Sequence, residues 1–341
     1  MVQKTLVVGG TGPTGVHLVN FLIEAGHNVT VFNSGQHDEG VEFVDSVERV
    51  YGNARDQDSV RTSIAKTNWD IVICTYGKLR MLADELAGKT KRFVGITGQP
   101  VYKGAARRTP DGSIPLPIQE HADRQYDASN YTGRVAVGED QIFMQHGRGD
   151  FEGVLVRYPG VYGPRAPLNH EWAVIRRVID KRPFMLMPHA GMSYFQRGYS
   201  ENVAWLVYLA ATRKEAPGNA FNSGDEHVLS AARVAELIID ELDSKMELID
   251  VPGDLCRNVY PLAEKAPLIL DMSKSRNLLG YRDRVPVEEA TRATARWYVD
   301  NPLPDGFDTD TVIPAAGSFD YEEEDRIRSS WLKAKEALSD L

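Results

Sequence analysis

The chain has 341 residues, of which 42% are hydrophobic and 26% charged, and its formal net charge at pH 7 is −9. This content suffices for a substantial core in one large domain, or in one domain with a smaller lobe. The negative net charge disfavours binding through a nucleic-acid phosphate backbone, so we expect no nucleic-acid partner. Two cysteines, Cys74 and Cys256, are too few for a disulfide framework or a metal cluster, and no metal site is predicted. Neither a charged-then-apolar leader nor a membrane-length apolar run is seen, so we expect a cytoplasmic protein without a membrane partner.

The first predicted strand, Lys4–Val8, leads into a glycine-rich turn at residues 9–15. A helical pattern of apolar residues follows and stops at Gly26, and a second apolar run occupies Val29–Phe32. Strand, turn, helix and strand within about thirty residues is the context that a dinucleotide-binding turn requires. The helix N-terminus there offers free N–H groups and its positive dipole end to a pyrophosphate. We therefore expect nucleotide binding, the alternative being a fold whose site is empty; the binding residues would be Gly9, Thr11, Gly12, Pro13, Thr14 and Gly15.

Further short runs along the first half of the chain are β-branched and nearly all apolar, as is typical of strands buried on both faces. They lie at Ser46–Val50, Asp70–Cys74, Arg92–Thr97 and Gly153–Arg157, and Ala220–Asn222 is a candidate for one more strand. With helical patterns between them, these runs predict an α/β fold: a Rossmann-type doubly wound parallel sheet with right-handed crossovers.

After Pro164, prolines and aromatic residues interrupt this alternation, which predicts a smaller, mixed C-terminal substrate lobe. It would contain a helix at Ser230–Leu242 and a second helix that begins with Pro286 as its first residue and runs to about Asp300. The acidic, then amphipathic end of the chain would pack on the body or contact a partner. The predicted parts are a dinucleotide-binding domain at 1–163, to which 195–225 returns, a substrate lobe at 164–194 and 226–316, and a helical extension at 317–341.

The end of the second predicted strand bears on the choice of cofactor. An acidic residue at this position would bind the ribose 2′-OH and repel a 2′-phosphate. The chain has Asn33, Ser34 and Gly35 instead, and no carboxylate before Asp38. These neutral groups favour NADP(H) over NAD(H).

Several separate motifs together resemble the short-chain dehydrogenase/reductase superfamily, specifically its extended and atypical NAD(P)-dependent epimerase/dehydratase branch. They are the cofactor loop at 9–15, the fifth strand at 92–97 with Val101-Tyr102, the active-site helix with Tyr131, Ala136 and Glu139, the segment 157–164 beneath the nicotinamide, the substrate-side motif at 196–204, and the approach to the final helix at 271–281. The resemblance covers roughly residues 4–300. It implies a Rossmann fold, a nicotinamide cofactor, a small-molecule substrate and a homodimer formed through the active-site helices.

The resemblance also assigns individual contacts. It places Asn53 and Ala54 beside the adenine, and it places further cofactor contacts at Thr75, Tyr76, Gly77, Tyr131, Pro159 and Val161. Substrate contacts are expected at Tyr102, Tyr162, His170, Trp172 and Arg197. Arg197 stands where nucleotide-sugar members of the family bind a phosphate, whereas the aromatic residues would serve equally well as the core of the lobe.

The chemistry implied by the resemblance is proton transfer by a tyrosine, here Tyr131, as hydride moves to or from the nicotinamide. A free tyrosine has a pKa of about 10, and a lysine four residues later normally lowers it. Position 135 is a valine in this chain. The usual serine or threonine before the tyrosine of the fifth-strand loop falls on Gly98, with Thr97 one position earlier as the candidate hydroxyl. Arg134, Lys78 and Lys103 are the candidate sources of the missing positive charge.

Three hypotheses follow. The first is an NADP(H)-dependent oxidoreductase acting on a carbonyl/alcohol pair of a small organic substrate, aromatic or sugar-like, with Tyr131 as proton donor and Thr97 orienting the substrate. The second, supported by Arg197, is an epimerase or dehydratase that retains NAD. The third is a non-catalytic, cofactor-sensing protein, supported by Val135 and Gly98.

Overall fold

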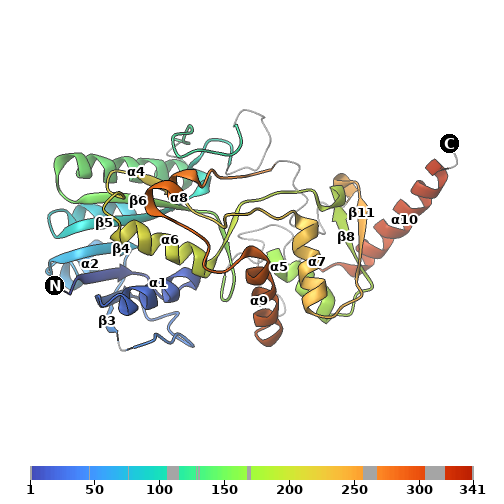
Figure 1. Cartoon of the computed structure of the whole chain (residues 1–341), viewed down its shortest axis with the longest axis horizontal. Helices are drawn as coiled ribbons and strands as arrows, with labels where there is room; N and C mark the ends of the chain where they lie inside the picture. Colours follow the sequence, from blue (N-terminus) through green and yellow to red (C-terminus); the bar gives the residue numbers. More distant parts are fainter. Residues whose placement is uncertain are drawn as a thin grey trace.

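The computed structural model describes residues 2–45, 47–75, 77–105, 115–127, 129, 131–166, 170–255, 267–303 and 319–339, without the side chains of Tyr131 and Ser339. A sheet flanked by helices forms one part of the molecule, and a smaller lobe lies beside it (Figure 1). Among the described residues, no helix is both long enough and apolar enough to cross a membrane.

The centre of the fold is a seven-stranded sheet with the order β10-β6-β5-β4-β1-β2-β3. All paired strands in it are parallel. The order reverses between β1 and β4, and ligands of such sheets bind in the crevice at this point. The predicted Rossmann-type doubly wound sheet is therefore confirmed, with these strands: β1 Lys4–Val8, β2 Asn28–Asn33, β3 Glu48–Tyr51, β4 Trp69–Cys74, β5 Thr90–Gly98, β6 Glu152–Tyr158 and β10 Ala220–Asn222.

Helices cover both faces of the sheet because its alternate side chains are apolar on each side. On one face, α1 (Pro13–Glu24) and α6 (Ser200–Thr212) share a core with alternate residues of β1, β2, β4, β5 and β6. On the other face, α2 (Gln57–Ser63), α3 (Leu79–Leu86) and α4 (Tyr131–Arg148) cover the remaining apolar side chains.

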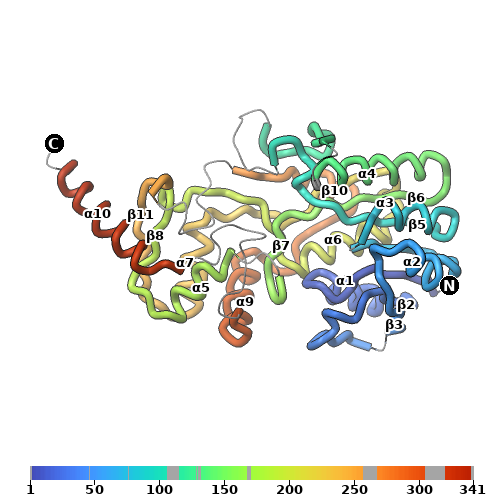
Figure 2. The backbone as a smooth tube through the Cα atoms, turned by 180° about the vertical axis from the view of Figure 1, so that it is seen from behind, coloured from blue at the N-terminus to red at the C-terminus, as the bar shows by residue number. Residues whose placement is uncertain are grey.

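The lobe has its own core among α5 (His170–Ile179), α7 (Ala231–Glu241) and α9 (Val287–Asp300). Two parallel strands, β8 (Phe184–Pro188) and β11 (Glu247–Val251), lie at its outer end. A second parallel pair, β7 (Gly160–Tyr162) and β9 (Arg197–Tyr199), links the two chain segments that run between sheet and lobe. Figure 2 shows β7 from behind, near the middle of the molecule.

The terminal helix α10 (Tyr321–Ser339) packs on the lobe with its first half only. Ile327 and Trp331 contact the apolar side chains of β8 and β11, and the Trp331 indole N–H donates to the Asp250 carbonyl at 2.8 Å. Glu324, fully buried, is ion-paired with Arg177 of α5. Residues 332–338 are exposed, and the helix projects from the far end of the molecule (Figure 1).

Three details differ from the sequence-based assignment. Strand β3 begins at Glu48, two residues later than predicted, and Ser46 lies outside the described residues. Helix α9 begins at Val287, because the backbone of Pro286 is extended and only its carbonyl joins the helix, accepting the Ala290 N–H at 2.8 Å. Helix α8 (Ser273–Leu279), assigned to the lobe, lies against the sheet, since Met272 and Leu279 join the core beneath α6.

Candidate functional site

The glycine-rich turn connects β1 to α1 with very close backbone packing. Gly9 and Gly10 have φ angles of 101° and 85°, a region that favours glycine. A Cβ on Gly15 would lie 2.5 Å from the Gly10 carbonyl carbon, so no side chain fits there. Helix α1 begins at Pro13 and directs its first N–H groups out of the turn. This geometry suits a pyrophosphate at the N-terminus of α1.

A cavity of about 740 Å³ opens above this turn at the switch point of the sheet. It brings together nearly all of the residues predicted to bind the cofactor, although they are far apart in sequence. The lining consists of Gly9, Gly10, Thr11, Gly12, Pro13, Thr14, Gly15, Asn33, Ser34, Gly35, Gln36, His37, Gly52, Asn53, Ala54, Thr75, Tyr158, Pro159 and Val161. Its volume is in the usual range for small-molecule and cofactor sites.

Sequence reasoning missed Gln36, His37, Gly52 and Tyr158 in this lining, although each lies within two residues of one that it assigned. The Tyr158 hydroxyl lies 3.2 Å from Thr14 Oγ1 and donates to it, which ties β6 to the first turn of α1. Burial raises the pKa of Tyr158 to about 12. Tyr158 is therefore a neutral part of the cavity wall at physiological pH.

Other predicted cofactor contacts lie differently. Gly77 has a φ of 106° and packs so closely on Ala54 that a Cβ would lie 2.8 Å from its carbonyl oxygen; it shapes the loop after β4 and does not line the cavity. Thr75, which does line it, donates its hydroxyl proton to the Val8 carbonyl at 2.9 Å. Tyr76 and the side chain of Tyr131 lie outside the described residues.

The carboxylate of Asp38 lies close to the end of β2, although Asp38 is five residues beyond Asn33 in the sequence. The loop after β2 folds back, so that the Asn33 amide donates to Asp38 Oδ1 at 2.7 Å. Arg49 of β3 pairs with the same carboxylate at 2.7 Å and compensates its charge. The Tyr51 hydroxyl adds a third contact at 3.3 Å. Sequence reasoning missed Arg49 because the pairing of β2 with β3 brings it there.

Thr97 lies at the end of β5 in a buried ionic network. Its hydroxyl donates to Glu139 Oε1 at 2.8 Å. Arg157 binds the same carboxylate through two N–H groups, at 2.9 and 2.7 Å, and Arg124 adds a contact at 3.1 Å. Glu139 is fully buried and Arg157 is 2% exposed. Although burial alone would lower it, the hydrogen bonds and charge of Glu139 hold the pKa of Arg157 above its usual range.

Tyr102 is enclosed in the same network and is not open to a substrate in this structure. Its hydroxyl donates to Asn222 Oδ1 at 2.5 Å and accepts from Arg157 at 2.9 Å. Burial raises its pKa to about 12. Sequence reasoning placed it in an open loop because the cover comes from β10, 120 residues later.

The substrate-side residues are mostly engaged with one another. The Tyr162 hydroxyl donates to Asp225 Oδ2 at 2.8 Å, and the Arg197 guanidinium lies 4.6 Å from the centre of the Tyr162 ring. Arg197 is also ion-paired with Glu171, which is fully buried. Because β9 pairs with β7, this group adjoins the cavity at Val161. Arg197 and Tyr162 do not line the cavity themselves, and their contact with a substrate stays a prediction.

Trp172 and His170 lie on α5 and are buried. Trp172 packs in the core of the lobe, with its ring 6.1 Å from that of Tyr298, as the core alternative predicts. The His170 ring lies 6.0 Å from that of Phe195. The candidate replacements for the missing lysine, Lys78, Lys103 and Arg134, are all exposed. Contact of these residues with a substrate or with Tyr131 stays a prediction.

Comparison with known proteins agrees with this geometry. The sequence model of the NAD-dependent epimerase/dehydratase family matches residues 5–85. A UDP-N-acetyl-α-D-glucosaminuronate decarboxylase of Bacillus cytotoxicus is 24% identical, over 87% of this chain and 98% of its own length. A chloroplast stem-loop binding protein of 41 kDa of Arabidopsis thaliana is also 24% identical, over 66% of this chain and 60% of its length.

Comparison of the fold with solved structures points in the same direction. The structure of an epimerase from Methanothermobacter thermautotrophicus superposes with a TM-score of 0.70 at 19% identity, covering 88% of this chain and 93% of the epimerase. The matched family is described as NAD-dependent epimerases and dehydratases, which supports the expectation of an enzyme with oxidoreductase-type chemistry. The resemblance read from the motifs is thereby confirmed: residues 5–85 match the model of the NAD-dependent epimerase/dehydratase family, and the fold of the chain is similar to that of the Methanothermobacter epimerase.

Proposed function

We propose that this protein is an NADP(H)-dependent oxidoreductase that acts on a carbonyl/alcohol pair of a small organic substrate. The observation that carries the proposal is the cavity of about 740 Å³ between the glycine turn, the end of β2 and the segment Pro159–Val161. A nicotinamide dinucleotide bound there would give or accept the hydride. The chain would hold the pyrophosphate at Gly12–Gly15, the adenosine near Asn53 and Ala54, and the nicotinamide near Val161.

The preference for NADP(H) is supported by the charge at the end of β2. Ser34, Gln36 and His37 line the cavity there, and the carboxylate of Asp38, which contacts Asn33, is compensated by Arg49. A 2′-phosphate would meet neutral hydrogen-bonding groups and a guanidinium. Titration with both cofactors tests this: NADPH should bind at least about tenfold tighter than NADH, a difference of about 1.4 kcal/mol. Equal or reversed affinities would overturn the preference.

Tyr131, the first residue of α4, would be the proton donor. With valine at position 135, no lysine lies one helical turn away to favour the tyrosinate, so a neutral donor suited to carbonyl reduction is expected. Thr97 would act with it, but its hydroxyl proton is directed to Glu139. The Thr97 oxygen would therefore accept a hydrogen bond from a substrate hydroxyl instead of donating to the carbonyl.

The test is a Tyr131→Phe variant assayed with NADPH against a panel of carbonyl compounds. Turnover should fall by at least about 100-fold, the usual contribution of a general acid, while the Kd for NADPH stays the same. Thr97→Val should raise the KM of hydroxylated substrates more than it lowers kcat. Full turnover of Tyr131→Phe would exclude this tyrosine as the proton donor.

An epimerase or dehydratase that retains NAD is the second candidate, since curated relatives carry such names. Its best residue, Arg197, is already paired with the buried Glu171, which leaves it less available to a substrate phosphate. Mass spectrometry of small molecules released on denaturation separates the two: stoichiometric NAD favours the second candidate, and an empty or NADPH-releasing protein favours the first.

Three further expectations belong to the proposal. A homodimer would form through α4, on which Met144 is 42% exposed, and sedimentation of the purified protein tests it. If the protein binds dinucleotide but converts no carbonyl or alcohol compound, it is a cofactor-sensing protein without turnover. A cytoplasmic location is proposed with it, and fractionation of the source cells tests that.

A further inference from the structure

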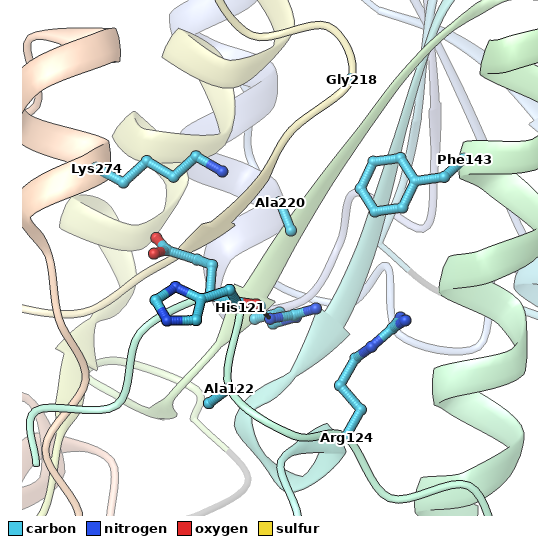
Figure 3. Close-up of a pocket in the computed structure, with 9 residues that line it drawn as sticks. His121, Ala122, Arg124, Phe143, Gly218, Ala220 and Lys274 are labelled. Atoms are coloured by element: carbon cyan, nitrogen blue, oxygen red, sulfur yellow. Dashed lines mark hydrogen bonds between the residues drawn. The ribbon is translucent and has the colours of Figure 1, made fainter. Parts of the chain in front are cut away.

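A second cavity, of about 500 Å³, lies at the β10 edge of the sheet between α4, α8 and the loop 118–124. It shares no lining residue with the proposed cofactor cavity. Figure 3 shows Lys274 of α8 on one side and Phe143 of α4 on the other, with Arg124 below Phe143 on that same side. The proposed reaction uses none of these three residues.

Lys274 is the positively charged residue of this cavity that has no direct ion pair among the described residues. It is half-buried, and among the described residues no carboxylate lies within 4 Å of its ammonium, which lies 5.4 Å from the centre of the Phe221 ring. Burial lowers its pKa, since the ammonium has lost part of its hydration. Glu120 attracts the ammonium from beyond 4 Å and offsets only part of the effect of burial, so an anion in direct contact with Lys274 would relieve the remaining cost.

The charges around the cavity limit the anion to a single negative charge. Arg157 and Arg124 are already bonded to Glu139, and Arg124 also to Asp140 at 2.7 Å. The charges of these two arginines and two carboxylates sum to zero. The remaining charged residues of the lining are Lys274 and Glu120. Glu120 is held by the Asn222 N–H at 3.0 Å, and burial raises its pKa, so that it competes less for the lysine. A polyanion would meet no further uncompensated charge.

On the side away from Lys274, the cavity is lined by the ring of Phe143 and by Arg124, whose charge is already paired with Asp140 and Glu139. Phe143 is half-buried, and Ala122 and Ala220 add methyl groups to the wall. Such a surface binds the hydrocarbon body of a ligand rather than a second polar group. An inorganic anion would leave this part of the cavity unfilled.

We propose that this cavity binds a small organic monocarboxylate, with its carboxylate at the Lys274 ammonium and its apolar body against Phe143. The site is separate from the reaction site and does not depend on the proposed function. The cavity is nonetheless connected to Thr97, because Arg157 both lines the cavity and shares Glu139 with Thr97.

The test is calorimetric titration of the full chain with benzoate, which has one carboxylate and one apolar ring, and with benzamide, its neutral counterpart. Benzoate should bind saturably with a Kd of about 1 mM or below, and benzamide at least about tenfold more weakly. Lys274→Met should weaken benzoate binding at least about tenfold, Lys274→Arg should keep it, and Lys245→Met, at an exposed lysine, should leave it unchanged.

Several results would overturn the proposal. They are equal binding of benzoate and benzamide, unchanged binding by Lys274→Met, loss of benzoate on saturation with NADPH, or no saturable binding up to about 10 mM. Circular dichroism of each variant shows that it is folded. Retention of binding by Lys274→Arg then separates loss of the charge from a general disturbance of α8.

Discussion

Replacing Glu139 by glutamine should destabilise the protein by about 3–5 kcal/mol, because it removes the only full negative charge that contacts the buried Arg157 within the described residues. Arg157 is 2% exposed, so water cannot take over from the carboxylate. The loss would be a large part of a typical stability of about 5–15 kcal/mol. Glu139→Gln keeps the size and one acceptor oxygen, so the effect reports the charge rather than a cavity.

Urea unfolding measures this. With an m-value of about 3 kcal/mol/M, the midpoint should fall by about 1–2 M. The double variant Glu139→Leu/Arg157→Met removes both charges and should recover most of the loss, since a buried pair replaced by apolar groups is often neutral. Glu236→Gln, at an exposed pair with Arg233, should cost less than about 1 kcal/mol.

Two results would refute this reasoning. A loss below about 1 kcal/mol for Glu139→Gln would mean that Arg157 does not depend on the carboxylate. A double variant as unstable as the sum of its single changes would mean that the two side chains act independently.

Three other changes give separate tests. Gly15→Val should weaken dinucleotide binding at least about 100-fold, because the added carbons meet the Gly10 backbone, whose carbonyl carbon is 2.5 Å from an ideal Cβ; titration measures it. Burial and the nearby Asp225 raise the pKa of Asp283 from 3.8 to about 7, so the folded protein keeps a proton that the unfolded chain loses. Stability should therefore fall as pH rises from about 4 to 7, by at most about 4 kcal/mol, and Asp283→Asn should flatten this fall in melting experiments. Glu324→Gln should destabilise the lobe by about 3 kcal/mol, because it takes the charge from the buried ion pair that holds α10, and limited proteolysis should then cut α10 first.

Their controls come from the same chain. Gly147→Ala, in α4 with open space around an added Cβ, should leave dinucleotide binding unchanged. Stability that rises between pH 4 and 7 in the parent but not in Asp283→Asn would reverse the sign argued here. Unchanged proteolysis of Glu324→Gln would show that the other contacts of the terminal helix, such as those of Ile327 and Trp331, hold it without this charge.

The sequence predicts the sheet well because its strands are fully buried. A strand covered on both faces must be apolar throughout, and Val29–Phe32 and Asp70–Cys74 are easily seen for that reason. The predicted boundaries are less accurate at β3, an edge strand whose residues are only half-buried. Pro286 was placed in the helix from its fixed φ, whereas its ψ of 144° keeps it outside.

The cavity was predictable for a similar reason, since residues at the carboxyl ends of adjacent parallel strands must meet at one edge of the sheet. The contacts made by long side chains cannot be predicted from the sequence in this way. The pairing of Asp38 with Arg49, and the closure of Tyr102 by Asn222, depend on which strands are neighbours and how far loops fold back. Hydrophobic periodicity carries no information on either, and Lys274 looks like any surface lysine of a short helix.

The projecting end of α10 has a practical consequence for handling the protein. Residues 332–338 are exposed at the tip of the molecule, on the far side of the lobe from the glycine turn (Figures 1 and 2). A fusion partner or a surface-immobilisation tag attached at this end would stand clear of both cavities. Immobilised in this way, the protein would present the cofactor cavity to solution, and single-molecule or sensor measurements could use it without blocking the site.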